Sequence, residues 1–245
     1  YKPIPETLLL KAQLSLAYTY YNLNEYEEAS KYFKIYIDSE LKNKNEEVFN
    51  SDIYLRLADS YYASKNFKKA IESYEKISEK KSDKNYLNYQ IGLSYNGINK
   101  NNQSIEFLDK VIDEGKNSLV DDALFRKAQI YLESSEFDNS ILTQNKLIQF
   151  HPYSNYLPYA YLNRATCYFN LKAYDQSEAD YLYILKNIMD EKIQNEALLG
   201  YQKVVSFTKN YSVLNESISN FRKKFPNNNI KKLQYENLRN LYFNQ

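Results

Sequence analysis

Residues 55–74, L-R-L-A-D-S-Y-Y-A-S-K-N-F-K-K-A-I-E-S-Y, place two small residues and two tyrosines at fixed distances. Tyr61 follows Ala58 after three positions, and Tyr74 follows Ala70 after four. Apolar residues around them recur at i, i+3, i+4 and i+7, which is the spacing of one helix face. The stretch therefore predicts two amphipathic helices that cross closely at the small residues, with tyrosines filling the space beside the crossing.

The same pattern returns along the whole chain. The first small residue of each unit, or the residue in register with it, stands at positions 17, 58, 92, 128, 165 and 202, with separations of 41, 34, 36, 37 and 37. Such spacing is typical of repeat arrays. We therefore expect an all-α, right-handed superhelical solenoid of antiparallel helix pairs. The pairs span residues 10–43, 51–84, 85–118, 121–154, 158–191 and 195–228 within a domain of 1–231, and 232–245 form the first helix of a truncated further repeat or a capping helix.

The residues that carry this pattern resemble the tetratricopeptide repeat family over nearly the whole chain. In that family a small residue in the first helix is followed by an aromatic residue three positions later and by a second small residue nine beyond that. A large residue comes four further on. Ala17, Tyr20, Ala29 and Phe33 match this order as well as residues 58–74 do. The resemblance implies a protein that holds other molecules on its surface and is not a catalyst.

Two units depart from the family pattern. Gln144 stands where the fourth unit should have a large apolar residue. The sixth unit fits by register rather than by residue type, with Gln202, Val205, Leu214 and Ile218 at the motif positions. We expect the fold to extend through both units, with the packing of the last pair the least defined.

Glycine is scarce, with four residues in the chain, whereas asparagine recurs between the two helices of a unit. Asparagine tolerates the left-handed backbone conformation and can bond its own backbone. We therefore expect Asn24, Asn66, Asn99 and Asn210 to take the place of glycine at or near these turns.

Charge and composition argue against several classes of function. The 245 residues carry a formal net charge of +1, and the lysines are spread rather than gathered on one face, which argues against nucleic-acid binding. No run of 18 or more apolar residues is present, so we expect no direct membrane insertion.

The chain offers few groups for catalysis or metal binding. The one histidine, His151, lies in a loop, and we interpret it as a surface residue without a catalytic partner. The one cysteine, Cys167, stands on a helix face that should be packed, which predicts a buried inert thiol. Asp121 and Asp122 are adjacent and point about 100° apart on a helix, so they form no catalytic dyad. We expect no enzyme activity, no cofactor and no metal site.

The concave groove of the family is the candidate binding surface. In the family the first helices of successive units line this groove, so the resemblance implies that the same positions here contact a partner. Aromatic rings with polar tips, flanked by amides, suit an extended peptide. The alternative is that many of the 27 tyrosines only seal contacts between units. Carried over by register, the groove residues are Tyr18, Tyr21, Asn22, Leu55, Asp59, Tyr62, Tyr89, Asn96, Phe125, Gln129, Asn163, Thr166, Phe169 and Lys203.

Some members of the family bind chaperones by holding a C-terminal carboxylate with lysine and asparagine at fixed positions. The matching positions here are Leu14, Tyr18 and Arg56. The resemblance therefore does not imply binding to the tails of heat-shock chaperones.

Two junction sequences bear on the cellular setting. S-L-V-D-D-A-L-F at 118–125 and H-P-Y-S-N-Y-L-P-Y-A-Y at 151–161 resemble the unit junctions of bacterial envelope repeat proteins. This resemblance implies a periplasmic or outer-membrane-associated scaffold that binds a peptide or partner protein. Two alternatives stay open: a cytoplasmic sensor or adaptor array of a signalling protein, and a glycan-binding module that stacks sugars on its groove tyrosines.

Overall fold

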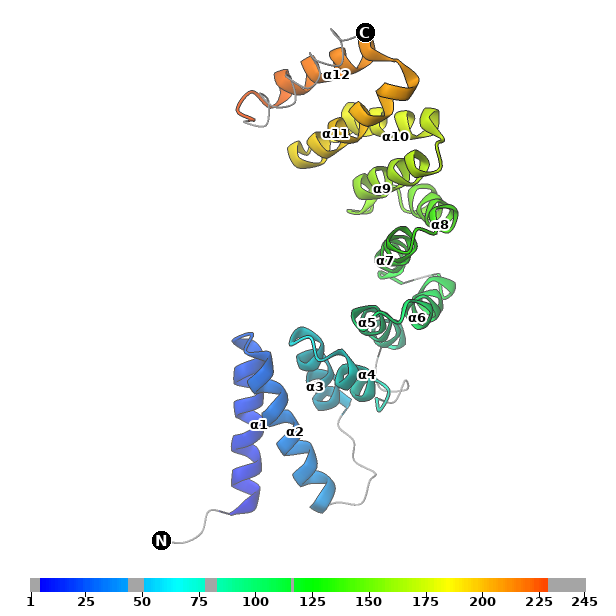
Figure 1. Cartoon of the computed structure of the whole chain (residues 1–245). Helices are drawn as coiled ribbons and strands as arrows, with labels where there is room; N and C mark the ends of the chain where they lie inside the picture. The colour runs from blue at the N-terminus through cyan, green and yellow to red at the C-terminus, as the bar shows by residue number, and fades with distance from the viewer. Residues whose placement is uncertain (1–4, 44–50, 78–82, 116, 229–245) are drawn as a thin grey trace. The chain divides into compact units, whose positions relative to one another are not determined.

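The computed structural model describes residues 5–43, 51–77, 83–115 and 117–228, which form twelve α-helices and no strand. The expected all-α helical repeat fold is confirmed (Figure 1). The chain divides into two compact units, Tyr1–Ala123 and Leu124–Gln245, and the boundary falls within a helix. The helix expected at 232–245 lies outside the described residues.

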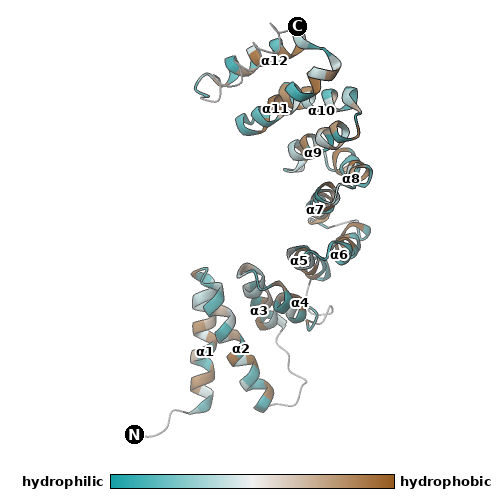
Figure 2. Cartoon of the chain, in the orientation of Figure 1, coloured by the Kyte–Doolittle hydropathy of each residue, from teal (hydrophilic) through white to brown (hydrophobic). Residues whose placement is uncertain are grey.

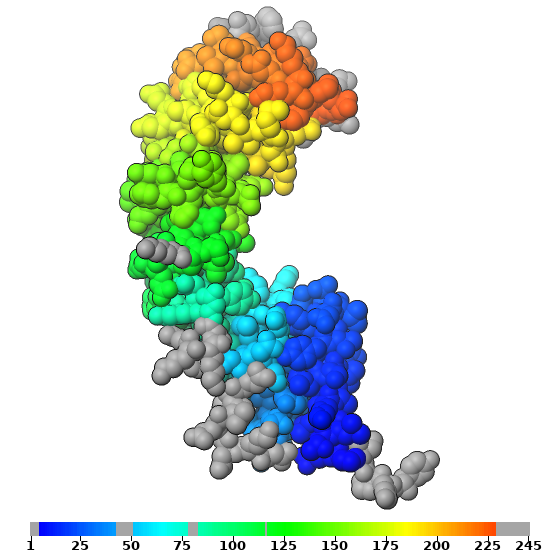
Figure 3. All heavy atoms as spheres, turned by 180° about the vertical axis from the view of Figure 1, so that it is seen from behind, coloured from blue at the N-terminus to red at the C-terminus, as the bar shows by residue number. Residues whose placement is uncertain are grey.

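The first unit is a stack of three helix pairs. Within each pair the two helices lie antiparallel, and the second helix of one pair packs on the first helix of the next. Figure 3 shows the same order from the opposite side, with blue, cyan and green atoms in close contact. The pairs are α1 (Glu6–Asn22) with α2 (Tyr26–Asn43), α3 (Ser51–Ala63) with α4 (Phe67–Tyr74), and α5 (Lys84–Gly97) with α6 (Asn101–Asp113).

The second unit begins within α7 (Val120–Glu133) and continues the pattern. Hydrophobic and hydrophilic residues alternate along each of its helices (Figure 2). Each helix from α8 onward packs on the next one along the chain, and α11 also contacts α9. The helices are α8 (Phe137–Phe150), α9 (Leu157–Asn170), α10 (Tyr174–Asn187), α11 (Glu191–Thr208) and α12 (Tyr211–Lys224).

Small residues lie buried where the helices of a pair cross, as the sequence predicts. Ala58 and Ala70 have no exposed surface. In three pairs the second small residue is a serine, and its hydroxyl crosses to the facing helix and donates to a backbone carbonyl. The three bonds run from Ser104 Oγ to Gly92 O (2.7 Å), from Ser140 Oγ to Ala128 O (2.9 Å) and from Ser177 Oγ to Ala165 O (2.7 Å).

One left-handed residue makes each turn between the helices of a pair. Asn24 and Asn99 take this conformation as expected, with φ of 62° and 58°. At the other two expected turns the prediction is wrong by one position, because the left-handed residues are Lys65 and Lys209. The register of the pair decides the position: in every pair the left-handed residue stands seven after the first small-residue position. The residue type only decides how well that position is tolerated.

The sixth pair packs differently from the family pattern. Tyr201 is fully buried, whereas its neighbour Gln202, which the register placed at the crossing, is half-buried. At Gly200 of α11 an added Cβ would lie 2.3 Å from Cζ of Tyr181, so α11 approaches α10 closely at this residue. The motif therefore identifies the pair but not its contact residues.

Candidate functional site

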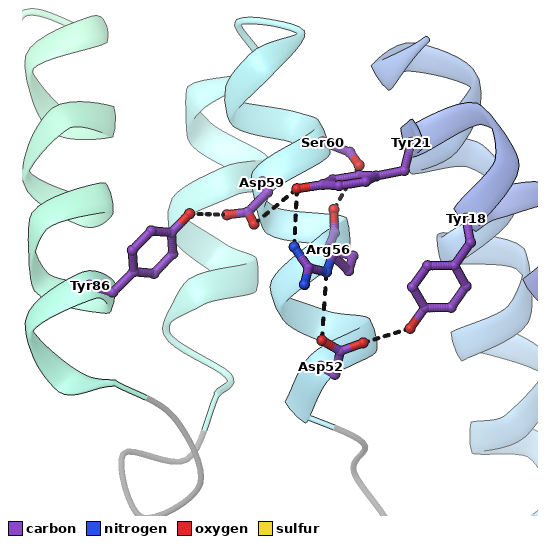
Figure 4. A network of polar contacts seen from close by, with 7 residues as sticks. All are labelled: Tyr18, Tyr21, Asp52, Arg56, Asp59, Ser60 and Tyr86. Atoms are coloured by element: carbon purple, nitrogen blue, oxygen red, sulfur yellow. Dashed lines mark hydrogen bonds and ion pairs between the residues drawn. The ribbon is translucent and has the colours of Figure 1, made fainter. Parts of the chain in front are cut away.

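Polar side chains converge on α3 in the first unit (Figure 4). Residues 52, 56 and 59 are spaced by four and three, so they share one face of α3. Tyrosines reach this face from α1 and α5 (Figure 4), and a further one comes from α4. We call this group the Asp59 network: Tyr18, Tyr21, Asp52, Arg56, Asp59, Tyr74 and Tyr86.

Asp59 is the centre of the network, because three tyrosine hydroxyls donate to its carboxylate. Tyr74 and Tyr86 donate to Oδ1 over 2.7 and 3.0 Å, and Tyr21 donates to Oδ2 over a longer 3.4 Å. Burial raises the pKa of Asp59, although these hydroxyls and Arg56 favour the ionised form. The carboxylate is therefore held in place by three neighbouring helices at a cost in desolvation.

Arg56 lies between two carboxylates on the same helix. Its Nη1 donates to the hydroxyl of Tyr21 over 3.3 Å, and its guanidinium lies 5.3 Å from the centroid of that ring. Its Nε is 3.6 Å from Oδ1 of Asp52, and Tyr18 donates to Oδ2 of the same carboxylate over 2.6 Å. Burial and the bond to Asp52 raise the pKa of Tyr18 to about 12, so its hydroxyl stays protonated at neutral pH.

A pocket of about 400 Å³ opens beside the network. Asp83, at the start of α5, caps that helix: its Oδ1 accepts the N–H groups of Asn85 (2.9 Å) and Tyr86 (3.2 Å). The pocket thus combines carboxylates with an apolar surface. Its lining residues are Asp52, Leu55, Arg56, Asp59, Asp83, Tyr86 and Leu87.

A larger hollow of about 540 Å³ lies on a different face of the same unit, against α2 and α4. The charged residues that line it are all exposed, and Lys31 forms a local ion pair with Glu28. Exposed ion pairs of this kind contribute little to stability, and none of the residues that line this hollow is a desolvated charged group like Asp59. The pocket beside Asp59 is therefore the better candidate site, although it is smaller.

The expected groove residues of the first unit differ in their burial and in their contacts. Tyr18, Tyr21 and Asp59 converge in the network. Tyr62, Asn96 and Leu55 are half-exposed, and Asn22 is exposed. The expectation that Tyr89 lines the groove is corrected, because Tyr89 is buried with only 9% of its surface exposed. Leu55 stands at the same distance before Ala58 and is half-exposed, so the stacking of the helices, and not the register, decides that Tyr89 is buried.

The same correction applies to Phe125 in the second unit. It precedes Ala128 by three positions, is 8% exposed and stacks on Tyr156 at a centroid distance of 4.4 Å. The remaining expected residues of this unit do not form a polar cluster like the Asp59 network. Gln129, Asn163, Thr166 and Phe169 are half-exposed and Lys203 is exposed.

The tyrosines three positions after the first small residue differ in burial, and of Tyr61, Tyr95, Tyr131 and Tyr168 only Tyr61 is buried. Tyr95, Tyr131 and Tyr168 are half-buried. Tyr95 stacks on Phe107 of the second helix at a centroid distance of 5.5 Å, which covers one face of its ring. The motif position therefore lies at the edge of the pair rather than inside it.

Sequence reasoning missed Asp52, Asp83 and Tyr86, and it considered Arg56 only as a mismatch to the chaperone-binding pattern. The spacing of Asp52, Arg56 and Asp59 on one helix face was the available signal. It did not indicate which other helices would approach that face.

The second unit contains a buried ion pair with a structural role. Arg164 Nε and Nη2 donate to the two oxygens of Asp180 over 2.8 and 2.6 Å, and Nη1 donates to Asn145 over 2.5 Å. The guanidinium lies between the rings of Tyr161 and Tyr168, at 5.1 and 5.9 Å. This pair joins α8, α9 and α10, and its carboxylate is too enclosed to meet a ligand.

The cysteine and the histidine that the sequence offered for catalysis differ in burial. Cys167 is fully buried, which confirms the burial expected from the sequence, and burial raises the pKa of its thiol. His151 is half-buried and follows the end of α8. Among the described residues, no three histidine, cysteine or carboxylate side chains converge as metal ligands would, and no helix is long and apolar enough to cross a membrane.

Comparisons with known proteins bear on the first unit and on the fold. The sequence model of the tetratricopeptide repeat family matches residues 14–84, which include most of the Asp59 network. A comparison with curated proteins finds no match in sequence.

Solved structures with a similar fold include several tetratricopeptide repeat proteins. One from Parabacteroides merdae has a TM-score of 0.63 at 12% identity, covering 88% of this chain and 79% of that chain. PilW, a type IV pilus biogenesis factor, has a TM-score of 0.56 at 17% identity, covering 90% and 96%. MamA from Desulfovibrio magneticus has a TM-score of 0.57 at 10% identity, covering 73% and 97%. At these identities the likeness concerns the fold.

Proposed function

We propose that this tetratricopeptide repeat protein is a non-catalytic scaffold that binds an extended segment of a partner protein along α1, α3 and α5 of its first unit. The observation that carries the proposal is the convergence of the Asp59 network on these helices, beside a pocket that α3 and the start of α5 line. Helical repeat proteins use such surfaces to hold other molecules.

The energetics of Asp59 favour binding over a purely structural role. A desolvated carboxylate costs free energy, and a well-packed apolar residue would join the same helices at a lower cost. Charged groups in such perturbed surroundings, next to a pocket, occur preferentially at functional sites. Asp59 is fixed by tyrosines from α1, α4 and α5, so it is already positioned for a ligand.

The chemistry of the pocket supports a role without catalysis. Its lining contains carboxylates, one guanidinium and one tyrosine, but no histidine, cysteine or serine that could act as a nucleophile with a base. Burial raises the pKa of Tyr86, which keeps its hydroxyl protonated and unable to serve as a base.

The tyrosines of the network are placed for hydrogen bonding rather than for stacking on a sugar. Tyr18 packs edge-to-face on Phe33 at a centroid distance of 5.1 Å, and one face of Tyr21 is occupied by the guanidinium of Arg56. This arrangement favours a peptide over the glycan alternative. We place the scaffold in the bacterial envelope because of its junction sequences, and the likeness to a pilus biogenesis factor agrees with that setting.

Random-peptide phage display with the full chain as bait tests this proposal. Selected peptides should lose affinity on Tyr62→Ala by about 30-fold, since an aromatic anchor contributes on the order of 2 kcal/mol. Ile35→Ala is the matched control, because Ile35 is 43% exposed on α2 and lines only the other hollow. If display enriches no peptide, or if Ile35→Ala weakens binding while Tyr62→Ala does not, the proposal fails.

A further inference from the structure

We infer that the pocket beside Asp59 receives a single cationic side chain, a lysine or an arginine of the bound segment. This inference rests on the proposed function and adds the chemistry of the residue that the site recognises. It follows from the charge, the shape and the hydrogen bonding of the pocket.

Charge is the first argument. The carboxylates of Asp52, Asp59 and Asp83 line the pocket together with one guanidinium, that of Arg56. Arg56 already contacts Asp52 and the hydroxyl and ring of Tyr21. The carboxylates therefore exceed the positive charge by two, and this excess attracts a cation, most strongly beside Asp59, which is the least exposed of the three.

Hydrogen bonding is the second argument. Oδ1 of Asp59 accepts two short bonds from tyrosines, whereas the bond to Oδ2 is long, at 3.4 Å. Both bonds that cap α5 go to Oδ1 of Asp83, so Oδ2 takes no part in the cap. An ammonium or guanidinium group brings several N–H donors and forms stronger, charge-assisted bonds with such oxygens.

Shape is the third argument. A volume of about 400 Å³ is near the small end of ligand pockets, which are roughly 300–1,000 Å³, so it suits one long side chain. Leu55 and Leu87 provide an apolar wall for the methylene stem of a lysine or arginine, while the carboxylates meet its charged end. A metal ion does not explain the site, because the described carboxylates do not converge as metal ligands.

An NMR titration of the full-length chain tests the inference directly. The probes are N-acetyl-lysine amide and N-acetyl-arginine amide, with N-acetyl-glutamine amide as the neutral control and N-acetyl-glutamate amide as the anionic control. The cationic probes should shift the amide signals of residues 83–90 and the Arg56 Nε–H signal with a Kd on the order of 1–10 mM, since only one side chain is recognised. The neutral and anionic probes should leave these signals unchanged.

Two substitutions of opposite charge sharpen the test. Asp83→Asn should raise the Kd about threefold or more while keeping the helix cap, because asparagine caps as well as aspartate. Arg56→Gln should lower the Kd by a similar factor, because it removes a like charge from the pocket. Asp113→Asn is the matched control, since this exposed residue of the same unit does not line the pocket. An anion site would show the reverse pattern: the glutamate probe would bind, and Arg56→Gln would abolish binding.

Acidification gives an independent readout. A bound cation favours ionised Asp59, so binding should weaken as the pH falls through the raised pKa of this group. The groups that face Asp59 are Tyr21 from α1, Arg56 from α3, Tyr74 from α4 and Tyr86 from α5, with Asp52 beside Arg56. The tyrosine hydroxyls remain protonated over this range. Asp59→Asn should remove the part of this pH dependence that lies above the ordinary carboxyl range of about pH 4, and a dependence above that range that survives the substitution contradicts the inference.

The inference and the proposed function can fail separately. If display selects peptides that bind the α1, α3 and α5 face but carry no lysine or arginine at a fixed position, the scaffold function stands and the cationic pocket does not. If display selects nothing while the cationic probes saturate the pocket, the peptide-binding function is wrong and the pocket remains.

Discussion

Buried polar side chains differ in how completely their hydrogen bonds are satisfied. The serines at the crossings each donate to a carbonyl of the facing helix, so they combine small size with a satisfied hydroxyl. Gln144 is the opposite case. It is 1% exposed, its Nε2 donates to Ser140 Oγ over 3.0 Å, and among the described residues its Oε1 accepts no hydrogen bond.

Gln144→Leu should therefore stabilise the chain. The substitution restores the large apolar residue that the repeat pattern expects and removes an unsatisfied carbonyl, a gain of about 1–2 kcal/mol in the free energy of unfolding. Chemical denaturation measures it. Gln194→Leu is the control: Gln194 is equally buried but donates to the carbonyl of Ile188, so the same change should destabilise the fold. Equal effects of the two substitutions would contradict this account.

Asp59 should make the stability of the chain depend on pH. Because burial raises its pKa above the ordinary value of 3.8, the folded chain retains a proton that the unfolded chain has lost. The free energy of unfolding therefore falls as the pH rises from the ordinary carboxyl pKa through the raised pKa of Asp59. Asp59→Asn has no carboxyl group to titrate at this position, so the stability of the variant relative to the wild type should improve between about pH 4 and pH 7. Denaturation curves at both values measure the difference, and the exposed Asp113→Asn should show no such trend.

At the scale of the helix pair, the turn is determined by hydrogen bonds rather than by residue type. In the fifth pair, for example, the N–H of Ala173 reaches back to the carbonyl of Tyr168 over 2.9 Å, and Lys172 between them is left-handed. The same bond recurs from Glu136 to Tyr131 and from Lys100 to Tyr95. This closure requires a positive φ at one residue, whichever residue stands there.

Ser135→Gly should stabilise the fourth pair. Ser135 has a φ of 61°, and glycine adopts this conformation without the penalty that a Cβ brings. We expect a gain of about 0.5–1 kcal/mol after the extra chain entropy of glycine is counted. Asn24→Gly at the equivalent turn should change the stability much less, since asparagine tolerates this conformation. A loss of stability in Ser135→Gly would show that its side chain contributes more than its backbone costs.

At the scale of the whole molecule, the chain has two compact units, and each has its own buried residues. The polar interactions are distributed in the same way. The Asp59 network ties the helices of the first unit together, whereas the Arg164–Asp180 pair belongs to the second. In repeat proteins stability is a sum of local terms, so damage in one unit need not reach the other.

Arg164→Ala tests this separation. Removing one partner of a buried ion pair leaves an uncompensated carboxylate, at a cost of about 3–5 kcal/mol. Hydrogen exchange followed by mass spectrometry should show faster exchange in α8, α9 and α10, with α1 to α4 unchanged. If α1 to α4 lose the same protection, the two units unfold together and the local account is wrong.

The amino-acid sequence by itself determined the helix pairs, the small residues at their crossings and the buried thiol of Cys167. These features depend on periodicity within one or two helices, which a linear pattern records. The tertiary structure alone decided that Tyr89 is buried and that Tyr86 and Tyr74 meet Asp59. Those contacts join different helices, and their geometry depends on how the pairs stack. Residue spacing along one helix specifies a face but not which side chains of the neighbouring helices approach it.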